Sequence, residues 1–245
     1  MENAQLIGLS RQIALQRQMD VVANNLANIN TTGFKAEQIL FEEYLMPVAR
    51  DSDFAWSDQQ LSYTQDWATM HDMSGGALAQ TGNPLDVALQ GEGFLTVMTP
   101  AGERFTRSGA LQIDAEGILV NVDGHPVLAD GGEVRFEADE TDITIAADGT
   151  VSTAAGVKGQ LQIVEFANPQ DLVREGGNLF AGGTPAPATA TRIAQGFVER
   201  SNVSGVSEMA EMVRVSRAYQ SLASLMQRQD DMRRSAIQRL GDATA

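Results

Sequence analysis

The distribution of glycine and proline divides this chain into three parts. Residues 1–32 contain one glycine, Gly8, and no proline, and residues 206–240 contain neither. Nearly all of the 23 glycines and all seven prolines lie between these two ends. Because glycine and proline weaken helix interiors and mark turns, this pattern predicts a long helix at each end of a turn-rich middle.

Both ends also carry apolar residues at helical spacing, in steps of three and four that follow a heptad pattern. An isolated amphipathic helix of this length is only marginally stable, so each needs a partner on its apolar side. We predict that the two helices pair as a coiled coil and pack against neighbouring molecules; the alternative is that each packs on the protein's own core. The stripes are Leu15, Met19, Val22, Leu26 and Ile29, with Leu6, Leu9 and Ile13 offset from them, and Met212, Val215, Tyr219, Leu222 and Met226.

The middle of the chain alternates apolar and polar residues over short segments separated by turns. Asp123-Gly124 and Asp148-Gly149 are typical of two-residue hairpin turns. Residues 181–191 are rich in Gly, Ala, Thr and Pro and are predicted to form a loop. The fold class is therefore mainly β with terminal α, with an antiparallel β domain, a sandwich or partly closed barrel, inserted between the helices. The predicted domains are helix 1–35, linker or hairpin 36–82, β domain 83–203 and helix 204–245.

The charge and composition exclude several classes of function. The net charge is −15, and because each end carries +1, residues 36–203 carry −17, which disfavours nucleic-acid binding. Cysteine is absent and only His71 and His125 are present, so thiolate chemistry and Cys- or His-rich metal sites are excluded. Apolar runs are only a few residues long, so no membrane insertion is expected. The first residues also lack the pattern of a cleaved secretory signal.

No catalytic, cofactor or metal site is predicted. The adjacent carboxylates Glu42-Glu43, Asp139-Glu140 and Asp230-Asp231 are typical of solvated surfaces. The alternative of a carboxylate-dependent peptidoglycan hydrolase would place a site within residues 83–200, where no suitably spaced acid pair is identifiable. A further alternative is a soluble adaptor that works as a discrete dimer.

Three blocks of sequence resemble the signatures of the bacterial flagellar rod and hook protein family. Within that family the chain resembles the proximal-rod members, notably over residues 143–152, with the distal-rod members as the alternative. Distal-rod members usually carry a longer segment after the first helix than residues 36–80. The blocks are ANNLANINTTGFK at 23–35, TGNPLDVALQGEGF at 81–94 followed by FTRSG at 105–109, and GFVERSNV at 196–203 followed by RAYQ at 217–220.

This resemblance implies a structural subunit of the periplasmic rod of the flagellar basal body. The terminal helices would form an inner tube, and the acidic β domain would pack laterally outside it. The implied function is a drive shaft and export channel, with no cofactor. The implied partners are other rod subunits, including copies of this chain and the distal-rod protein, and the flagellar type III export apparatus, which exports without cleaving a signal.

The first signature block also predicts residues for subunit packing. Asparagines at helical spacing can form hydrogen bonds across a helix interface and fix its register; a frayed helix end is the alternative. Gly33 can take a left-handed conformation after the helix, and Phe34 would anchor the exit. In addition to the stripe residues from Leu15 to Ile29 and from Met212 to Met226, the predicted packing residues are Asn24, Asn25, Asn28, Gly33 and Phe34.

Overall fold

The computed structural model describes residues 2–45, 62–137 and 140–242 and divides the chain into two compact units. The helical unit consists of Met1–Leu26, Glu37–Met70 and Ser204–Ala245. The β unit consists of Ala27–Ala36 and His71–Val203. Residues 46–61 of the predicted linker or hairpin, and Asp139 of one predicted carboxylate pair, lie outside the described residues.

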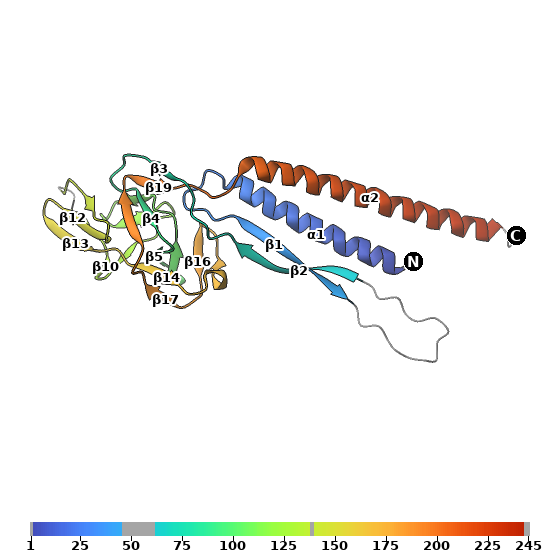
Figure 1. Cartoon of the computed structure of the whole chain (residues 1–245), viewed down its shortest axis with the longest axis horizontal. Helices are drawn as coiled ribbons and strands as arrows, with labels where there is room; N and C mark the ends of the chain where they lie inside the picture. The colour runs from blue at the N-terminus through green and yellow to red at the C-terminus, as the bar shows by residue number, and fades with distance from the viewer. Residues whose placement is uncertain (1, 46–61, 138–139, 243–245) are drawn as a thin grey trace. The chain divides into compact units, whose positions relative to one another are not determined.

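The helical unit contains the two long helices predicted from the chain ends. Helix α1 spans Glu2–Ala27 and helix α2 spans Gly205–Asp242 (Figure 1). Glu208 in the first turn of α2 and Arg239 in its last turn both complement the helix dipole. Strands β1 (Glu37–Leu45) and β2 (Ser62–His71) form a two-stranded sheet. Within the described residues, neither helix has an apolar stretch long enough to span a membrane.

The β unit is built around a six-stranded antiparallel sheet in the order β15-β16-β6-β5-β14-β17, which confirms the predicted antiparallel β architecture. Smaller sheets pair β18 with β4, β19 with β3, β7 with β8, β9 with β10, and β11 and β13 with β12. The short 3₁₀ helix η1 spans Pro169–Asp171. The strands are β3 (Leu78–Gln80), β4 (Val87–Gln90), β5 (Phe94–Thr99), β6 (Gly102–Thr106), β7 (Leu111–Ile113), β8 (Leu119–Asn121), β9 (Leu128–Ala129), β10 (Gly132–Glu133), β11 (Thr144–Ile145), β12 (Thr150–Thr153), β13 (Gly156–Gln160), β14 (Ile163–Phe166), β15 (Val173–Arg174), β16 (Leu179–Ala181), β17 (Pro185–Pro187), β18 (Arg192–Gln195) and β19 (Phe197–Glu199).

Local sequence predicted part of the turn and loop structure of the β unit. Asp148-Gly149 lies in the turn between the antiparallel strands β11 and β12, and Gly149 has a φ of +91°. The turn is longer than the predicted two-residue type, because the Ala146 N–H donates to the Thr150 carbonyl at 2.9 Å and three residues lie between them. In contrast, the stretch predicted as a loop at 181–191 contains β17, which pairs with β14 at the edge of the six-stranded sheet. An edge strand tolerates prolines because one side of it needs no backbone donors.

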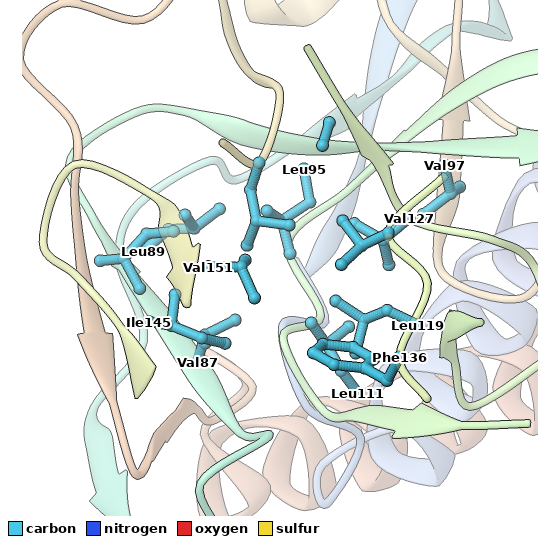
Figure 2. Close-up of a cluster of buried hydrophobic side chains, with 14 of the residues drawn as sticks. Val87, Leu89, Leu95, Val97, Leu111, Leu119, Val127, Phe136, Ile145 and Val151 are labelled. Atoms are coloured by element: carbon cyan, nitrogen blue, oxygen red, sulfur yellow. The ribbon is translucent and has the colours of Figure 1, made fainter. Parts of the chain in front are cut away.

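The core of the β unit lies on both faces of β5, whose successive side chains point to opposite sides. Leu95 and Val97 belong to a large aliphatic cluster, much of which Figure 2 shows. Phe94 belongs to a second cluster in which it packs edge-to-face on Phe166 and Phe180, with ring centroids 5.6 and 5.8 Å apart. The aliphatic cluster comprises Val87, Leu89, Leu95, Val97, Leu111, Leu119, Val127, Ala129, Val134, Phe136, Ile145, Val151, Leu161, Leu179 and Ile193.

Candidate functional site

The predicted packing residues of the first helix differ in their burial. Val22 is buried, while Leu15, Met19 and Leu26 are half-buried on α1. Ile29 lies beyond the end of α1 and packs in the β unit against Phe34, Ala36 and Val203. The predicted stripe therefore includes one residue, Ile29, that is not part of the helix. The chain turns after Ala27, and Thr31 Oγ1 donates a hydrogen bond to Asn28 Oδ1 in this turn at 3.1 Å.

The predicted stripe of α2 lies on the side of the helix that faces α1. Val215 is buried, and Met212, Tyr219, Leu222 and Met226 are half-buried. Gln12 Nε2 donates to Tyr219 Oη at 2.8 Å, and Gln18 Nε2 donates to Glu211 Oε1 at 2.9 Å. A Cβ atom on Gly8 would lie 3.3 Å from Met226 Sδ, so the glycine allows close approach. Increasing residue numbers on α1 meet decreasing numbers on α2, so the two helices run antiparallel.

Both helices keep a second apolar stripe exposed. On α1 the exposed residues are Leu6, Leu9 and Ile13, which the sequence places at helical spacing. On α2 they begin with Val206, Met209 and Val213, again in steps of three and four. Contiguous exposed apolar stripes of this kind are typical of surfaces that bind another protein.

Of the three asparagines predicted for subunit packing, Asn25 connects elements of the helical unit. Its side-chain amide exchanges two hydrogen bonds of 2.9 Å with the backbone N–H and C=O of Glu37 at the start of β1. Its Nδ2 also lies 3.4 Å from Glu208 Oε2 on α2. Asn24 is exposed on α1, and Asn28 lies in the turn after it. Asn25 therefore links α1 to both β1 and α2 within one chain.

Gly33 lies in the β unit at a position that only glycine fits. Its φ is +66°, and an added Cβ atom would lie 2.4 Å from the carbonyl carbon of Arg107. Its N–H donates to the carbonyl oxygen of Glu199 at 2.8 Å. Gly33 thus allows the segment after α1 to lie directly on the backbone of two other signature blocks.

Three charged side chains of the β unit form contacts with one another close to Gly33. Lys35, Arg107 and Glu199 are all at least 96% buried. Lys35 Nζ donates to Glu199 Oε1 at 2.7 Å, and Arg107 Nη2 lies 2.9 Å from Glu199 Oε2. Burial lowers the pKa of Lys35, and the ion pair with Glu199 opposes that shift. We call these residues the buried charge cluster.

Further hydrogen bonds satisfy the remaining polar groups of the buried charge cluster. Lys35 Nζ also donates to the Ser74 carbonyl at 2.6 Å, and the Gly76 N–H donates to Glu199 Oε1 at 2.8 Å. Arg107 Nη1 donates to the carbonyl oxygens of Gly91 and Gly93. Burying a charge raises the free energy of the folded state unless the charge is paired and hydrogen-bonded. The charges of this cluster are paired and hydrogen-bonded, so the cluster connects the three signatures within the β unit.

Asn202 joins three backbone segments of the β unit next to the cluster. Its Oδ1 accepts from the Ala36 N–H at 2.8 Å, and its Nδ2 donates to the Asp72 carbonyl at 2.8 Å. The Asp72 N–H in turn donates to the Ala36 carbonyl at 2.8 Å. Ala36, His71 and Val203 are residues of the β unit at which the chain leaves or enters the helical unit. The Asn202 side chain therefore connects the backbone next to these three crossing points.

Phe34 is buried, and its ring packs against the guanidinium group of Arg174. The Arg174 guanidinium carbon lies 4.2 Å from the centroid of the Phe34 ring, and Arg174 Nη2 donates to the Lys35 carbonyl at 2.7 Å. Asn178 Nδ2 donates to the Thr32 carbonyl at 2.9 Å. Gly33 and Phe34, predicted as packing residues, therefore have intramolecular partners in the β unit.

Sequence reasoning missed the charged members of this site. Each signature contains one cluster residue: Lys35 directly after Gly33-Phe34, Arg107 in FTRSG, and Glu199 in GFVER. Their place inside the signatures is the signal that could have identified them. Among the described residues, no group of three or more His, Cys, Asp or Glu side chains could hold a metal ion.

Comparison with protein families gives three matches in chain order. Residues 6–35 match the flagella basal body rod protein family, and residues 88–153 match the D1 domain of the flagellar hook protein FlgE/F/G. Residues 194–239 match the C-terminal region of the flagellar basal body rod FlgEFG proteins. Lys35, Arg107 and Glu199 come from these three regions, one from each.

Individual relatives match over almost the whole chain. The flagellar basal-body rod protein FlgF of Caulobacter vibrioides is 37% identical, with 98% of this chain and 99% of the relative covered. FlgF of Mesorhizobium japonicum is 34% identical with the same coverage. The flagellar basal-body rod protein FlgG of Bacillus subtilis is 31% identical, with 92% of this chain and 94% of the relative covered.

Proposed function

Because this chain belongs to the family of bacterial flagellar basal-body rod proteins, and is FlgF-like within it, we propose a specific way in which it builds the rod. The chain is a structural subunit of the flagellar basal body. In our proposal it occupies the proximal part of the rod, and the FlgG-type distal subunit is a related neighbour. The identities of 37% and 34% to two FlgF proteins, over nearly full length, support this assignment.

The observation that carries the assembly model is the exposed apolar surface of the helical unit. Leu6 and Ile13 on α1, and Val206 and Met209 on α2, are each at least half exposed. Burying such side chains contributes about 1.5–3 kcal/mol each, which favours association with other chains. In our proposal α1 and α2 pair as a coiled coil, and the helical units of many copies form the wall of a central channel.

The predicted packing residues have a defined role in this model. Leu15, Met19, Val22 and Leu26 on α1 and the stripe from Met212 to Met226 on α2 hold the helix pair together, and the exposed stripes contact neighbouring subunits. Asn24 contributes to such contacts from the surface, while Asn25 fixes the register of the helical unit. Asn28, Ile29, Gly33 and Phe34 support packing indirectly by fixing the segment that leaves α1.

The proposed function is mechanical. The rod transmits torque and encloses the path of exported proteins, and the acidic β units pack laterally on its outer side. The partners are other rod subunits, copies of this chain and the flagellar type III export apparatus, which delivers the chain to the periplasm without cleaving a signal. No nucleic acid, cofactor or chemical step enters this function.

Complementation of a strain that lacks this subunit tests the proposal. The wild-type chain should restore swimming and co-purify with basal bodies, and a variant with Leu9→Asp and Met209→Asp should do neither while remaining soluble. Sedimentation at increasing concentration separates open-ended growth from the closed dimer of an adaptor. Turnover of purified cell-wall sacculi by the wild-type chain, or its absence from basal bodies, would contradict the proposal.

A further inference from the structure

We propose that the β unit contains a peptide-binding site whose ligand is the segment that follows α1. Residues 32–36, Thr-Gly-Phe-Lys-Ala, fill this site in the folded chain, and we call them the docked segment. The same peptide supplied by a separate molecule fills the site when the chain's own segment cannot. The inference goes beyond the rod assignment, because it concerns only residues within the β unit.

The docked segment lies on the β unit without being part of its sheets or its main core. Residues 28–36 belong to no helix or strand of the described chain. The described members of the two large hydrophobic clusters all lie between Met73 and Ile193. Phe34 instead belongs to a small separate cluster. The sheets and the core of the β unit can therefore form before the docked segment binds to them.

Two side chains of the β unit bind carbonyl groups of the docked segment. Asn178 Nδ2 donates to the Thr32 carbonyl at 2.9 Å, and Arg174 Nη2 donates to the Lys35 carbonyl at 2.7 Å. Asn178 has a φ of +57°, a conformation that residues other than glycine adopt rarely and that is enriched at binding sites. This backbone conformation places a side-chain donor against the docked segment.

Other backbone groups of the docked segment are bound as well. The Gly33 N–H donates to the carbonyl oxygen of Glu199 at 2.8 Å, and the Ala36 N–H donates to Asn202 Oδ1 at 2.8 Å. The Asp72 N–H donates to the Ala36 carbonyl at 2.8 Å. In peptide recognition, main-chain hydrogen bonds give affinity and side-chain pockets give specificity. The β unit supplies such main-chain hydrogen bonds along the docked segment.

Three successive residues of the docked segment supply the specificity. A Cβ atom on Gly33 would lie 2.4 Å from the carbonyl carbon of Arg107, so only glycine fits there. Phe34 is 3% exposed, and its ring packs against a guanidinium group. Lys35 Nζ donates to Glu199 Oε1 at 2.7 Å. The site therefore selects a peptide that contains Gly-Phe-Lys.

The charges of the site stay balanced when the docked segment leaves. Without Lys35, Glu199 Oε2 still accepts from Arg107 Nε at 3.1 Å, and Glu199 Oε1 still accepts from the Gly76 N–H at 2.8 Å. One buried cation then pairs with one buried anion. A buried ion pair is tolerated when its hydrogen bonds are made, whereas an unpaired buried charge is not. The empty site thus keeps the paired charges that a preformed binding site requires.

A full-length variant with a displaced segment tests the inference. Gly33→Val together with Lys35→Ala should keep the chain's own segment out of the site. A fluorescent peptide with the sequence of residues 28–36 should bind this variant at least tenfold more tightly than the wild-type chain, whose tethered segment competes at high effective concentration. The control peptide carries Lys35→Ala and should bind the variant at least tenfold more weakly. Fluorescence anisotropy with the purified chains measures these affinities.

Three results would overturn the inference: no binding to the variant, equal binding of the two peptides, or equal binding to both chains. Thermal unfolding covers the case in which the double variant folds poorly. The wild-type peptide should raise the melting temperature of the variant, because it binds the folded state, and should leave that of the wild-type chain unchanged.

A milder variant, Phe34→Ala, keeps Gly33 and Lys35 and should bind the wild-type peptide with an affinity between those of the other two chains. If both variants stay unfolded in the presence of the peptide, the segment is part of the fold itself and the inference is wrong. All of these measurements use purified chains outside the flagellum. A negative result would therefore leave the proposed rod function intact.

Discussion

The two units of this chain differ sharply in what they bury. Among the described residues, the buried apolar side chains belong to the β unit except for Ala14, Val22 and Val215. The helical unit instead leaves apolar residues of both helices exposed, up to 79% for Val206. The β unit thus has the core of an independently folded domain, whereas the helical unit retains exposed apolar stripes on both helices, which are typical of protein-binding surfaces.

The ion pairs of the two units also differ in burial. In the β unit, Lys35, Arg107 and Glu199 are almost fully removed from water. In the helical unit, the Arg214 side chain that pairs with Glu211 is 75% exposed. Breaking a buried pair leaves an uncompensated charge, whereas an exposed pair contributes little. The difference predicts where a single substitution destabilises the folded monomer and where it affects only assembly.

The largest expected effect on the stability of the β unit is that of Glu199→Gln. This variant leaves Lys35 and Arg107 buried without a counter-charge and should lower the free energy of unfolding by about 3–5 kcal/mol. Urea denaturation of the purified chain measures the change. The control is Glu175→Gln, which breaks the more exposed pair with Arg104 and should cost less than about 1 kcal/mol. Equal losses in the two variants would contradict the role of the cluster.

Next in size is the effect of Gly33→Ala, compared with Gly82→Ala. Both glycines have a positive φ, so each substitution costs about 1–2 kcal/mol in backbone strain. An added Cβ at Gly82 meets open space, whereas at Gly33 it collides with the backbone of Arg107. Gly33→Ala should therefore destabilise the β unit by at least about 1 kcal/mol more. If Gly82→Ala lowered the free energy of unfolding more than Gly33→Ala, the close packing of Gly33 on the Arg107 backbone would not contribute to stability.

A much smaller stability effect is expected from deleting residues 206–245. Because the β unit has its own core, its melting temperature should fall by no more than about 4 °C, the equivalent of under 1 kcal/mol. Swimming should nevertheless be lost, since each subunit would lack α2. Differential scanning calorimetry and a motility assay measure the two outcomes. Loss of the melting transition in the shortened chain would show that α2 is part of the core of the β unit.

The smallest expected effect concerns Asp148 at the β11–β12 turn. The Thr150 N–H donates to its carboxylate at 3.0 Å and lowers the pKa of Asp148 below its ordinary value of 3.8. A lowered pKa gives stability that is present above the ordinary pKa and is lost as the pH falls through the lowered one. Asp148→Asn should therefore be slightly less stable than wild type at pH 7, and the difference should shrink near pH 3. Thermal unfolding at both pH values measures it, and a difference that grows in acid would exclude this hydrogen bond as its cause.

The elements that depend on neighbouring residues could be predicted from the sequence. The scarcity of glycine and proline predicted both helices, and Asp148-Gly149 predicted a turn between β11 and β12, because helix propagation and tight turns depend on a few successive residues. The signature blocks identified the family. Heptad spacing also predicted the stripe on α2, although it placed Ile29 on α1 when that residue lies in the β unit.

Contacts between residues that are distant in the sequence became visible only in the folded chain. Lys35 and Glu199 are 164 residues apart in the chain, and no local pattern shows that one ammonium group will find one carboxylate. The same is true of Asn202, whose partners lie in segments that are adjacent only after folding. Both helices carry two apolar stripes, and spacing alone cannot say which stripe packs within the chain. That choice depends on how closely two helices can approach, which Gly8 opposite Met226 permits on one face.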